Sequence, residues 1–255
     1  MEPPSEEKQN TKDSSFRGRK AKGSKIEEKH KHIPARGLIS NLLLGLTDGV
    51  VTNVAFLAGF AGAVQSLEFI RLAGFASMLA GAISMFFGGL SAARANQDLF
   101  KADSRRELNE IESEPDEERQ ELKEFYLDKG LTQEESEIVV NRITSDKKRW
   151  LDDLLMHELH LHREELENPI KVATVIGAAF LLGAIVPLIG YLLTPQKTLG
   201  IELSVSFSLV FLFLVGGWKG RLSGRKFLTA GIEMFLIGAG ASALLFLIGS
   251  LFTFV

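Results

Sequence analysis

The chain has 255 residues, of which 24% are charged, with a net charge of −3 at pH 7 and a mean hydropathy of +0.11. Acidic and basic residues nearly balance, so the composition gives no reason to expect a nucleic acid as partner. The chain contains no cysteine. This excludes disulfides, thiolate metal sites and cysteine nucleophiles, and any bound metal must be held by carboxylates, histidines, methionine thioethers or backbone oxygens.

The first segment, residues 1–36, is polar and rich in Lys, Glu and Ser, without an apolar core. This composition predicts a disordered arm and not a cleaved signal peptide. Most other charges gather in residues 95–171 and 219–226, and the rest of the chain is nearly uncharged. This distribution favours several membrane helices over one large soluble domain.

Five stretches after the arm are apolar enough to cross about 30 Å of hydrocarbon, which takes roughly 20 helical residues. They predict five transmembrane helices, over residues 38–63, 72–94, 172–193, 199–218 and 228–254. Short links join the first span to the second and the third to the fourth, so each pair is expected to form a tight helical hairpin. Pro187 lies inside the third span, where it is expected to bend the helix.

Basic residues indicate how the spans are oriented. They gather at the end of the arm, after the second span and after the fourth span. By the positive-inside rule, these three regions face the cytoplasm, and the hairpin links and the C-terminus face the other side. The N-terminus and the polar segment between spans two and three are therefore expected in the cytoplasm.

This polar segment, residues 95–170, has a strongly helical pattern and is expected to form a small domain. The second span is predicted to continue as a helix until Pro115, and the next helix to end at Gly130. Thr132 and Glu135 then have capping-box spacing at the start of another helix, and a last helix leads back to the membrane.

The predicted fold is thus an all-α membrane protein with five transmembrane helices and a cytoplasmic helical metal-binding insertion between spans two and three. Its expected parts are the arm (1–36), spans one and two (37–94), the insertion (95–170) and spans three to five (171–255).

Asp48 lies within the first apolar span. An ionised carboxylate in hydrocarbon costs about 3 kcal/mol or more, so it is kept mostly where it faces a polar cavity or a partner charge. We expect Asp48 to belong to an ion pathway; the alternative is a protonated carboxyl that bonds a neighbouring helix. On a helix, its face is shared by four small residues, Gly45, Thr52, Ala55 and Gly59.

Met85 projects from a stripe of small residues in the second span. Its thioether is a candidate ligand for an ion that passes Asp48, and simple packing is the alternative.

The insertion carries two pairs of glutamates. Glu107 and Glu110 are three residues apart on one predicted helix, as are Glu118 and Glu121 on the next, so each pair lies on one helix face. Across a helical hairpin, the pairs can converge as oxygen ligands for divalent cations. The alternative is a solvated acidic face with nearby arginines as counter-charges. Further candidates on the last helix are Met156, His157, Glu158, His160 and His162.

Over residues 36–254, the sequence resembles the vacuolar iron transporter family. The resemblance rests on LTDGVVTNVAFLAGFAGA, GAISMFFGG, GAIVPLIGYLL and GIEMFLIGAGASALLFLIG in four of the spans, and on the order of motifs from DLF and RREL to MHEL in the insertion. It implies five transmembrane helices, a homodimer with its pathway between the subunits, and proton-coupled export of Fe2+ or Mn2+ from the cytoplasm.

The resemblance also implies roles for individual residues. It assigns Asp48 and Met85 to the translocation pathway. It assigns metal binding in the insertion to Glu107, Glu110, Glu118, Glu121 and Glu158. Two positions depart from the family pattern: Gly89 replaces a glutamate found in many members, and Leu154 and Leu155 replace a methionine pair found in some.

We therefore expect a transporter and not an enzyme, without a prosthetic group, whose partners are divalent metal ions, protons, membrane lipid and a second copy of the chain. Its membrane would be a plasma (inner) membrane or a vacuolar membrane. The alternative is a membrane-anchored protein that buffers metal or oxidises iron at carboxylates. A di-iron site of that kind needs Glu-x-x-His twice, and the residues around Glu158 do not supply this spacing.

Overall fold

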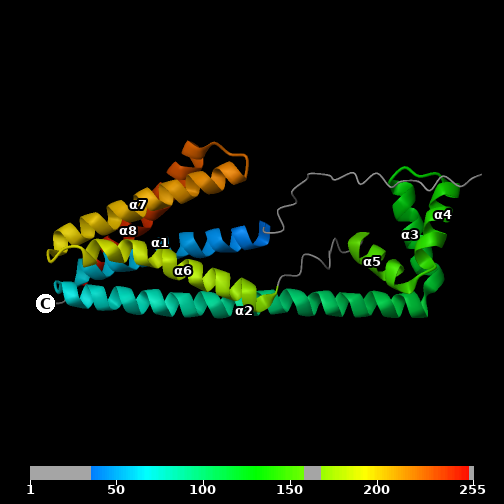
Figure 1. Cartoon of the computed structure of the whole chain (residues 1–255), viewed down its shortest axis with the longest axis horizontal. Coiled ribbons are helices and arrows are strands. Elements are labelled where there is room, and N and C mark those ends of the chain that lie inside the picture. Colours follow the sequence, from blue (N-terminus) through cyan, green and yellow to red (C-terminus); the bar gives the residue numbers. More distant parts are fainter. Residues whose placement is uncertain (1–35, 158–167, 253–255) are drawn as a thin grey trace, which may run out of the picture. The chain divides into compact units, whose positions relative to one another are not determined.

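The computed structural model describes residues 36–157 and 168–252, and all regular structure in these ranges is α-helical. The predicted arm, except for its last residue, lies outside them. Figure 1 labels the helices in chain order. They are α1 (Arg36–Ala63), α2 (Leu67–Ser113), α3 (Pro115–Asp128), α4 (Gln133–Thr144), α5 (Lys147–His157), α6 (Pro169–Leu192), α7 (Lys197–Leu222) and α8 (Phe227–Leu251).

Five of these helices, α1, α2, α6, α7 and α8, are long and apolar enough to cross a membrane, which confirms the five predicted spans. The second span begins earlier than its hydropathy suggests, at Leu67 and not at residue 72. Its first turns contain Glu68 and Arg71. Ser66 caps the helix, because its hydroxyl oxygen accepts a hydrogen bond from the backbone N–H of Phe69 at 3.5 Å.

The predicted helix boundaries between the second and third spans are confirmed. Helix α2 continues for 47 residues without a break, and Pro115 starts α3. Proline suits this first helical position, because no helical acceptor is available there for a backbone N–H. Gly130, which follows α3, has a φ of +92°, a conformation that favours glycine. The capping box at α4 forms as well: the Thr132 hydroxyl accepts from the Glu135 N–H at 3.3 Å, and Glu135 accepts from the Thr132 N–H at 2.9 Å.

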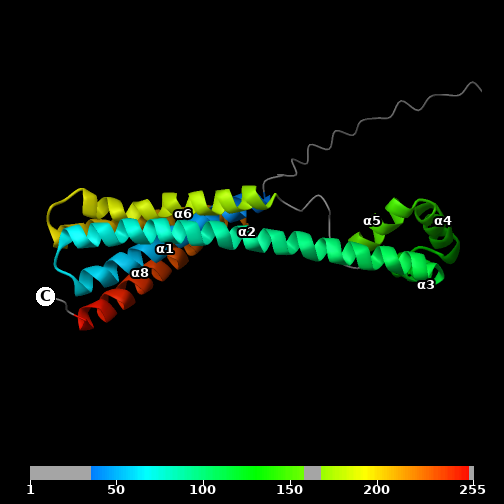
Figure 2. The same cartoon turned by 90° about the horizontal axis from the view of Figure 1, so that it is seen from below.

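The five long helices pack around α1 and α6. Helix α1 contacts α6 and α8, α6 also contacts α2 and α7, and α7 contacts α8 (Figures 1 and 2). One apolar core in this bundle consists of Leu57, Ala61, Ile70, Leu188 and Tyr191. Large apolar side chains on the outer faces of α2 and α8 are exposed, as expected for helices that border lipid.

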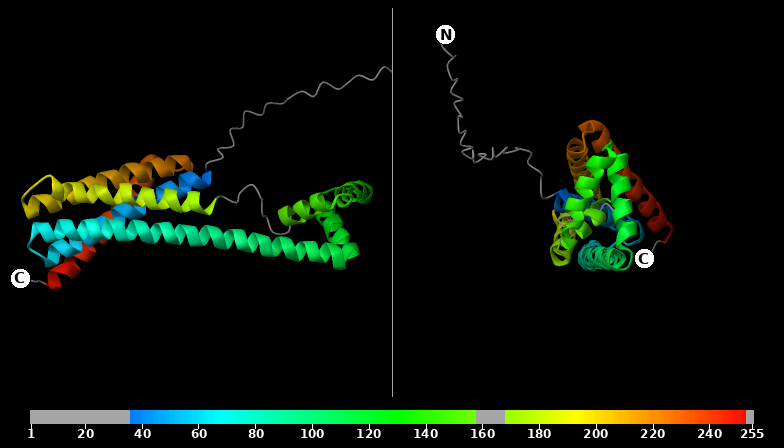
Figure 3. Two further views of the ribbon diagram at one scale, coloured as in Figure 1. Left: turned by 60° about the horizontal axis from the view of Figure 1, so that its bottom comes forward. Right: turned by 90° about the vertical axis from the view of Figure 1, so that its right-hand side faces the viewer.

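The three short helices make a second core with the distal part of α2. Helix α3 contacts α4, α4 contacts α5, and both α3 and α5 contact α2 (Figure 3). The buried members of this core are Ile111, Leu122, Val140, Ile143, Trp150 and Leu154. Helices of this length are only marginally stable by themselves in water, so the burial of these apolar side chains stabilises them. The predicted end of the last insertion helix, after His157, lies outside the described residues.

Candidate functional site

Asp48 lies in the middle part of α1 and is half-buried. The Thr52 hydroxyl, one turn later, donates to Asp48 Oδ1 at 3.4 Å. Among the described residues, no lysine, arginine or histidine forms an ion pair with Asp48. The Asp48 carboxylate therefore lies within an apolar helix, and no described residue of the chain supplies a cation to it.

The small residues around Asp48 do not all meet one neighbour. Gly45 packs against the backbone of α6, and Gly59 packs against Leu245 on α8. Ala55 is buried, whereas Thr52 is exposed. The face predicted as one contact surface is thus shared between two neighbouring helices, and Asp48 and Thr52 remain at the surface of the chain.

Met85 on α2 is half-buried and packs against a cluster of Ala82, Phe180 and Ala184. Part of its thioether side chain therefore holds α2 on α6, and part remains accessible. Near it, Gly89 lies close to α6: a side-chain Cβ at this position would be 3.0 Å from Ile176 Cδ1 and 3.4 Å from Ala173 Cα. A glutamate here would displace Ile176, so this departure from the family pattern agrees with close packing between α2 and α6.

In the insertion, Glu107 is the most enclosed carboxylate, with 1% of its surface exposed. Its Oε1 accepts from Arg106 Nη2 at 2.9 Å, and its Oε2 has no hydrogen-bond partner among the described residues. The same guanidinium lies 3.6 Å from Asp103 and 3.9 Å from Glu110. One exposed arginine thus lies beside three carboxylates on the last turns of α2 and offsets part of their negative charge.

The other predicted ligands differ in exposure. Glu118 is buried, one turn before Leu122 of the insertion core, whereas Glu121 is exposed. Met156, near the end of α5, is 39% exposed. Glu158, together with His160 and His162, lies outside the described residues. Within the described ranges, no three His, Asp or Glu side chains are grouped closely enough to hold a metal ion.

Leu154 and Leu155, which replace a methionine pair of some family members, are both buried. Leu154 belongs to the insertion core with Trp150 and Leu122. These two positions therefore contribute to packing, and Met156 is the exposed sulfur ligand candidate on this helix.

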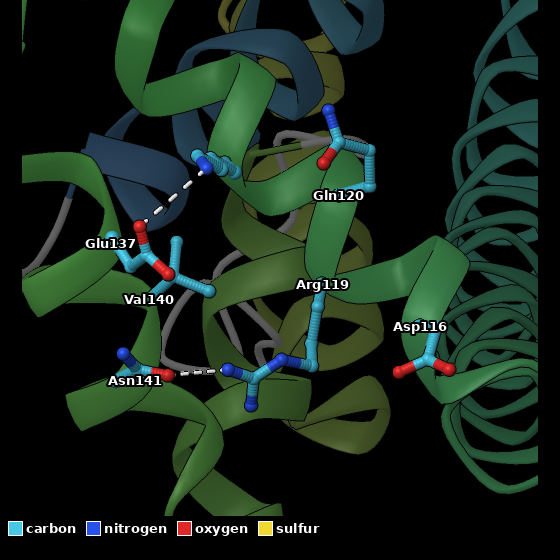
Figure 4. A pocket seen from close by; sticks show the side chains of 7 residues that line it. Asp116, Arg119, Gln120, Glu137, Val140 and Asn141 are labelled. Atoms are coloured by element: carbon cyan, nitrogen blue, oxygen red, sulfur yellow. Dashed lines mark hydrogen bonds and ion pairs between the residues drawn. The ribbon is translucent and has the colours of Figure 1, made fainter. Parts of the chain in front are cut away.

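A polar hollow between α3 and α4 lies apart from the predicted ligands. Figure 4 shows Arg119 directed at Asn141, to which it donates a hydrogen bond, and Arg119 also donates to the Thr144 hydroxyl at 2.6 Å. Lys123 and Glu137 form an ion pair across the same hollow at 3.9 Å. Its basic groups are thus engaged with neighbours, and the hollow links two helices of the insertion.

Sequence reasoning missed an aromatic and acidic cluster that holds the end of α5 on α3. The Tyr126 hydroxyl donates to Asp153 at 3.0 Å, and the His157 ring stacks on Phe125 with 3.7 Å between ring centroids. Burial, with a contribution from Asp153, raises the pKa of Tyr126 to about 12. Tyr126 and Asp153 are 27 residues apart in the chain, so no local spacing indicates this contact.

Two polar side chains in the bundle were also missed. Arg71 on α2 donates from Nε to the carbonyl of Tyr191 at 2.9 Å and from Nη2 to that of Thr194 at 2.8 Å. It thereby caps the C-terminus of α6, where backbone carbonyls lack helical donors. Asn53 on α1 is fully buried and donates to the carbonyl of Ala184 on α6 at 2.6 Å.

Comparisons with known proteins agree with the resemblance seen in the sequence. The VIT family model matches residues 39–250. Vacuolar iron transporter 1 of Arabidopsis thaliana is 34% identical over 216 residues, which cover 85% of this chain and 86% of that protein. Vacuolar iron transporter 2 of Oryza sativa subsp. japonica is 34% identical over 220 residues, covering 86% and 89%. The vacuolar iron transporter of Toxoplasma gondii is 30% identical over 226 residues, covering 85% and 75%. The chain therefore belongs to the VIT family, whose members are transporters and not enzymes.

Proposed function

We propose that the protein is a homodimeric carrier that exports Fe2+ or Mn2+ from the cytoplasm in exchange for protons. The names of its relatives support iron as the cargo and a vacuolar membrane as the location, with a plasma (inner) membrane as the other candidate. In this proposal, Asp48 and Met85 belong to the pathway, and the glutamates of a cytoplasmic insertion collect the metal.

The observation that carries the proposal is the carboxylate of Asp48, which lies in the middle part of an apolar helix without a cationic partner in the described residues. Such a group is stabilised when it binds a cation or a proton, and the two compete for the same oxygens. Metal bound on one side is thus released when the carboxyl is protonated on the other side. Met85 adds a soft sulfur ligand, which favours Fe2+ over Mg2+ or Ca2+.

The insertion supplies a second set of carboxylate ligands for metal, on the cytoplasmic side. Glu107 is enclosed and has an oxygen without a hydrogen-bond partner in the described part of the chain, which is costly unless a cation or water binds it. Arg106, whose side chain is 53% exposed, occupies the position of a counter-cation beside Glu107 and Glu110. A divalent metal with carboxylate ligands would replace this guanidinium, and the negative charges would raise the local metal concentration.

An exposed stripe on α2 supports the homodimer. Small residues recur on it at every fourth position, and all are exposed: Ala76, Ala80, Ser84, Gly88 and Ala92. A Cβ built at Gly88 would meet nothing within 4 Å. Stripes of this kind let two membrane helices approach closely, and a helix of a second copy fits this surface.

The proposal is tested by metal flux into proteoliposomes that contain the full-length protein, with Fe2+, Mn2+, Zn2+ and Ca2+ compared under an imposed pH gradient. We expect Fe2+ or Mn2+ uptake that is faster with an acidic lumen and that falls to background in Asp48→Asn. Glu233→Gln is the matched control, because Glu233 is also a carboxylate in a membrane helix but is paired with Arg225 at 2.6 Å. Its flux should stay close to that of the natural protein.

Full metal-for-proton exchange in Asp48→Asn would show that this carboxylate does not couple the two ions. Metal binding without any flux would favour the buffering alternative over a transporter of these ions. Flux that does not depend on the pH gradient would support a metal carrier and contradict proton exchange.

A further inference from the structure

The side chain of Asn53 is the most enclosed polar group on α1, with no exposed surface. Its Nδ2 donates to the backbone carbonyl of Ala184 on α6 at 2.6 Å, while its Oδ1 has no hydrogen-bond partner among the described residues. An amide is costly to bury in an apolar environment unless it is hydrogen-bonded. This residue is therefore kept between the helices for a reason other than filling space.

The acceptor of this bond lies in the turn of α6 that contains Pro187, which is fully buried. Proline has no N–H to donate to the carbonyl four residues earlier, that of Gly183, and its ring crowds this turn. In membranes, neighbouring helices can compensate for backbone hydrogen bonds that such a proline disrupts. Asn53 donates a hydrogen bond to Ala184, the residue next to Gly183.

Glycines on both helices bring the backbones of α1 and α6 close together beside this bond. A Cβ at Gly45 or Gly49 would overlap backbone atoms of α6, and one at Gly183 would overlap the Leu46 carbonyl on α1. Two backbones that meet in this way pack closely, but they offer few side-chain ridges to fix their rotation or sliding. A hydrogen bond from a buried side chain to one particular carbonyl fixes both.

The same turn of α6 also holds α2. Ala184 and Phe180 form a buried cluster with Ala82, and Met85 packs against it. Ala184 therefore binds Asn53 of α1 through its carbonyl and belongs to the cluster that packs α6 on α2.

We propose that Asn53 is a positioning residue for transport: its bond to the proline turn of α6 sets the register of Asp48 on α1 against Met85 on α2. Asn53 follows Asp48 by five residues, which places it about 140° around the helix and about 7.5 Å along it. Asn53 thus faces α6 while Asp48 remains at the surface of the chain. The inference rests on the proposed function, because Asp48 and Met85 must both meet the metal.

The test combines a distance measurement with metal flux in the full-length protein. Because the chain has no cysteine, spin labels can be attached at Phe56→Cys on α1 and Leu182→Cys on α6, both exposed positions. With labelled chains diluted in unlabelled ones, so that a dimer has one labelled subunit, we expect one narrow distance distribution with Asn53 present. In Asn53→Leu, which keeps the volume but removes the donor, the distribution should be shifted or broader. Half-saturating Fe2+ concentration should rise about threefold to tenfold, the range that loss of one interhelical hydrogen bond supports.

The matched control is Ser242→Ala, which removes another buried polar group. Within the described residues, its hydroxyl bonds to its own helix, donating to the Gly238 carbonyl at 2.7 Å. This substitution should change neither the distance nor the flux. If Asn53→Leu does not fold, Asn53→Ser is measured in its place, with a smaller shift expected because the hydroxyl retains a donor.

An unchanged distance together with lost flux would overturn the inference, because Asn53 would then act on the ion and not on the register. An altered distance with unchanged Fe2+ dependence would overturn it as well. If the natural protein carries no metal at all, the proposed function fails, and the label distances still decide whether Asn53 holds α1 on α6.

Discussion

Helices α1 and α6 meet backbone to backbone, whereas α3, α4 and α5 meet through large apolar side chains. In the first pair, glycines such as Gly49 and Gly183 let the two backbones approach so closely that a Cβ would overlap backbone atoms. In the insertion, Trp150, Leu122 and their neighbours form a compact core. The difference follows from the solvent. In lipid, the hydrophobic effect does not drive helices together, so close packing and hydrogen bonds must hold them. In water, the burial of apolar side chains stabilises the packed helices.

The largest loss of stability is expected when the close contact between α1 and α6 is disrupted. Gly183→Val places side-chain atoms against the Leu46 carbonyl, which belongs to the backbone and cannot move aside. We expect a loss of about 4 kcal/mol or more in stability and little monodisperse protein, measured by size exclusion and thermal unfolding in detergent. Gly240→Val is the matched control, because a Cβ there meets nothing within 4 Å. Equal behaviour of the two variants would contradict close packing between α1 and α6.

A smaller effect is expected when the core of the insertion is reduced. Leu122→Ala removes a side chain that is 1% exposed, which should destabilise the insertion by about 3 kcal/mol. Ile138→Ala serves as control, because Ile138 on α4 is 70% exposed. Hydrogen exchange should show faster opening of α3 to α5 in Leu122→Ala only, with α6 to α8 unchanged. Faster exchange throughout α6 to α8 would show that the two cores unfold together.

The capping box at α4 is a local polar contact, which the insertion uses in addition to its apolar core. Thr132→Ala should cost about 1 kcal/mol, and Thr132→Ser should cost little. Hydrogen bonds from the Thr132 backbone N–H and hydroxyl lower the pKa of Glu135. The stability that this carboxylate contributes is therefore present above its ordinary pKa and is lost as the pH falls through the lowered value. The protection of amides in the first turn of α4, which compares their exchange with the intrinsic rate at each pH, should fall in this acidic range. Protection that stays unchanged through this range would contradict the assignment.

The smallest effect is expected at the ion pair between Arg225 and Glu233, which joins the α7–α8 link to α8 at 2.6 Å. Both side chains are about half exposed, so Glu233→Gln should change stability by less than about 1 kcal/mol. The melting temperature should shift at low salt, and the shift should disappear at high salt. A large, salt-independent loss would show that this pair is enclosed by lipid.

Local signals explain how much of the fold was predictable. The apolar spans, the break at Pro115, the turn at Gly130 and the capping box of Thr132 each depend on residues adjacent in the chain. The start of α2 was placed too late, because Glu68 and Arg71 lower the hydropathy of its first turns, whereas the cap at Ser66 begins the helix at Leu67.

For the candidate site, the sequence indicates residue types but not their environment. Helical spacing alone could not separate Glu107, which is enclosed beside the insertion core, from Glu121, which is exposed. Nor could it show that Leu154 belongs to that core, since burial depends on which helices pack together.

The sequence by itself determined the five spans, the helix ends at Pro115, Gly130 and Thr132, and the presence of Asp48 in an apolar helix, because composition and short-range spacing carry this information. Only the tertiary structure decided that Gly45 meets α6 while Gly59 meets α8, and that Asn53 bonds to Ala184, 131 residues away. Contacts between distant segments depend on the rotation and register of whole helices, and no local pattern specifies these before the helices pack.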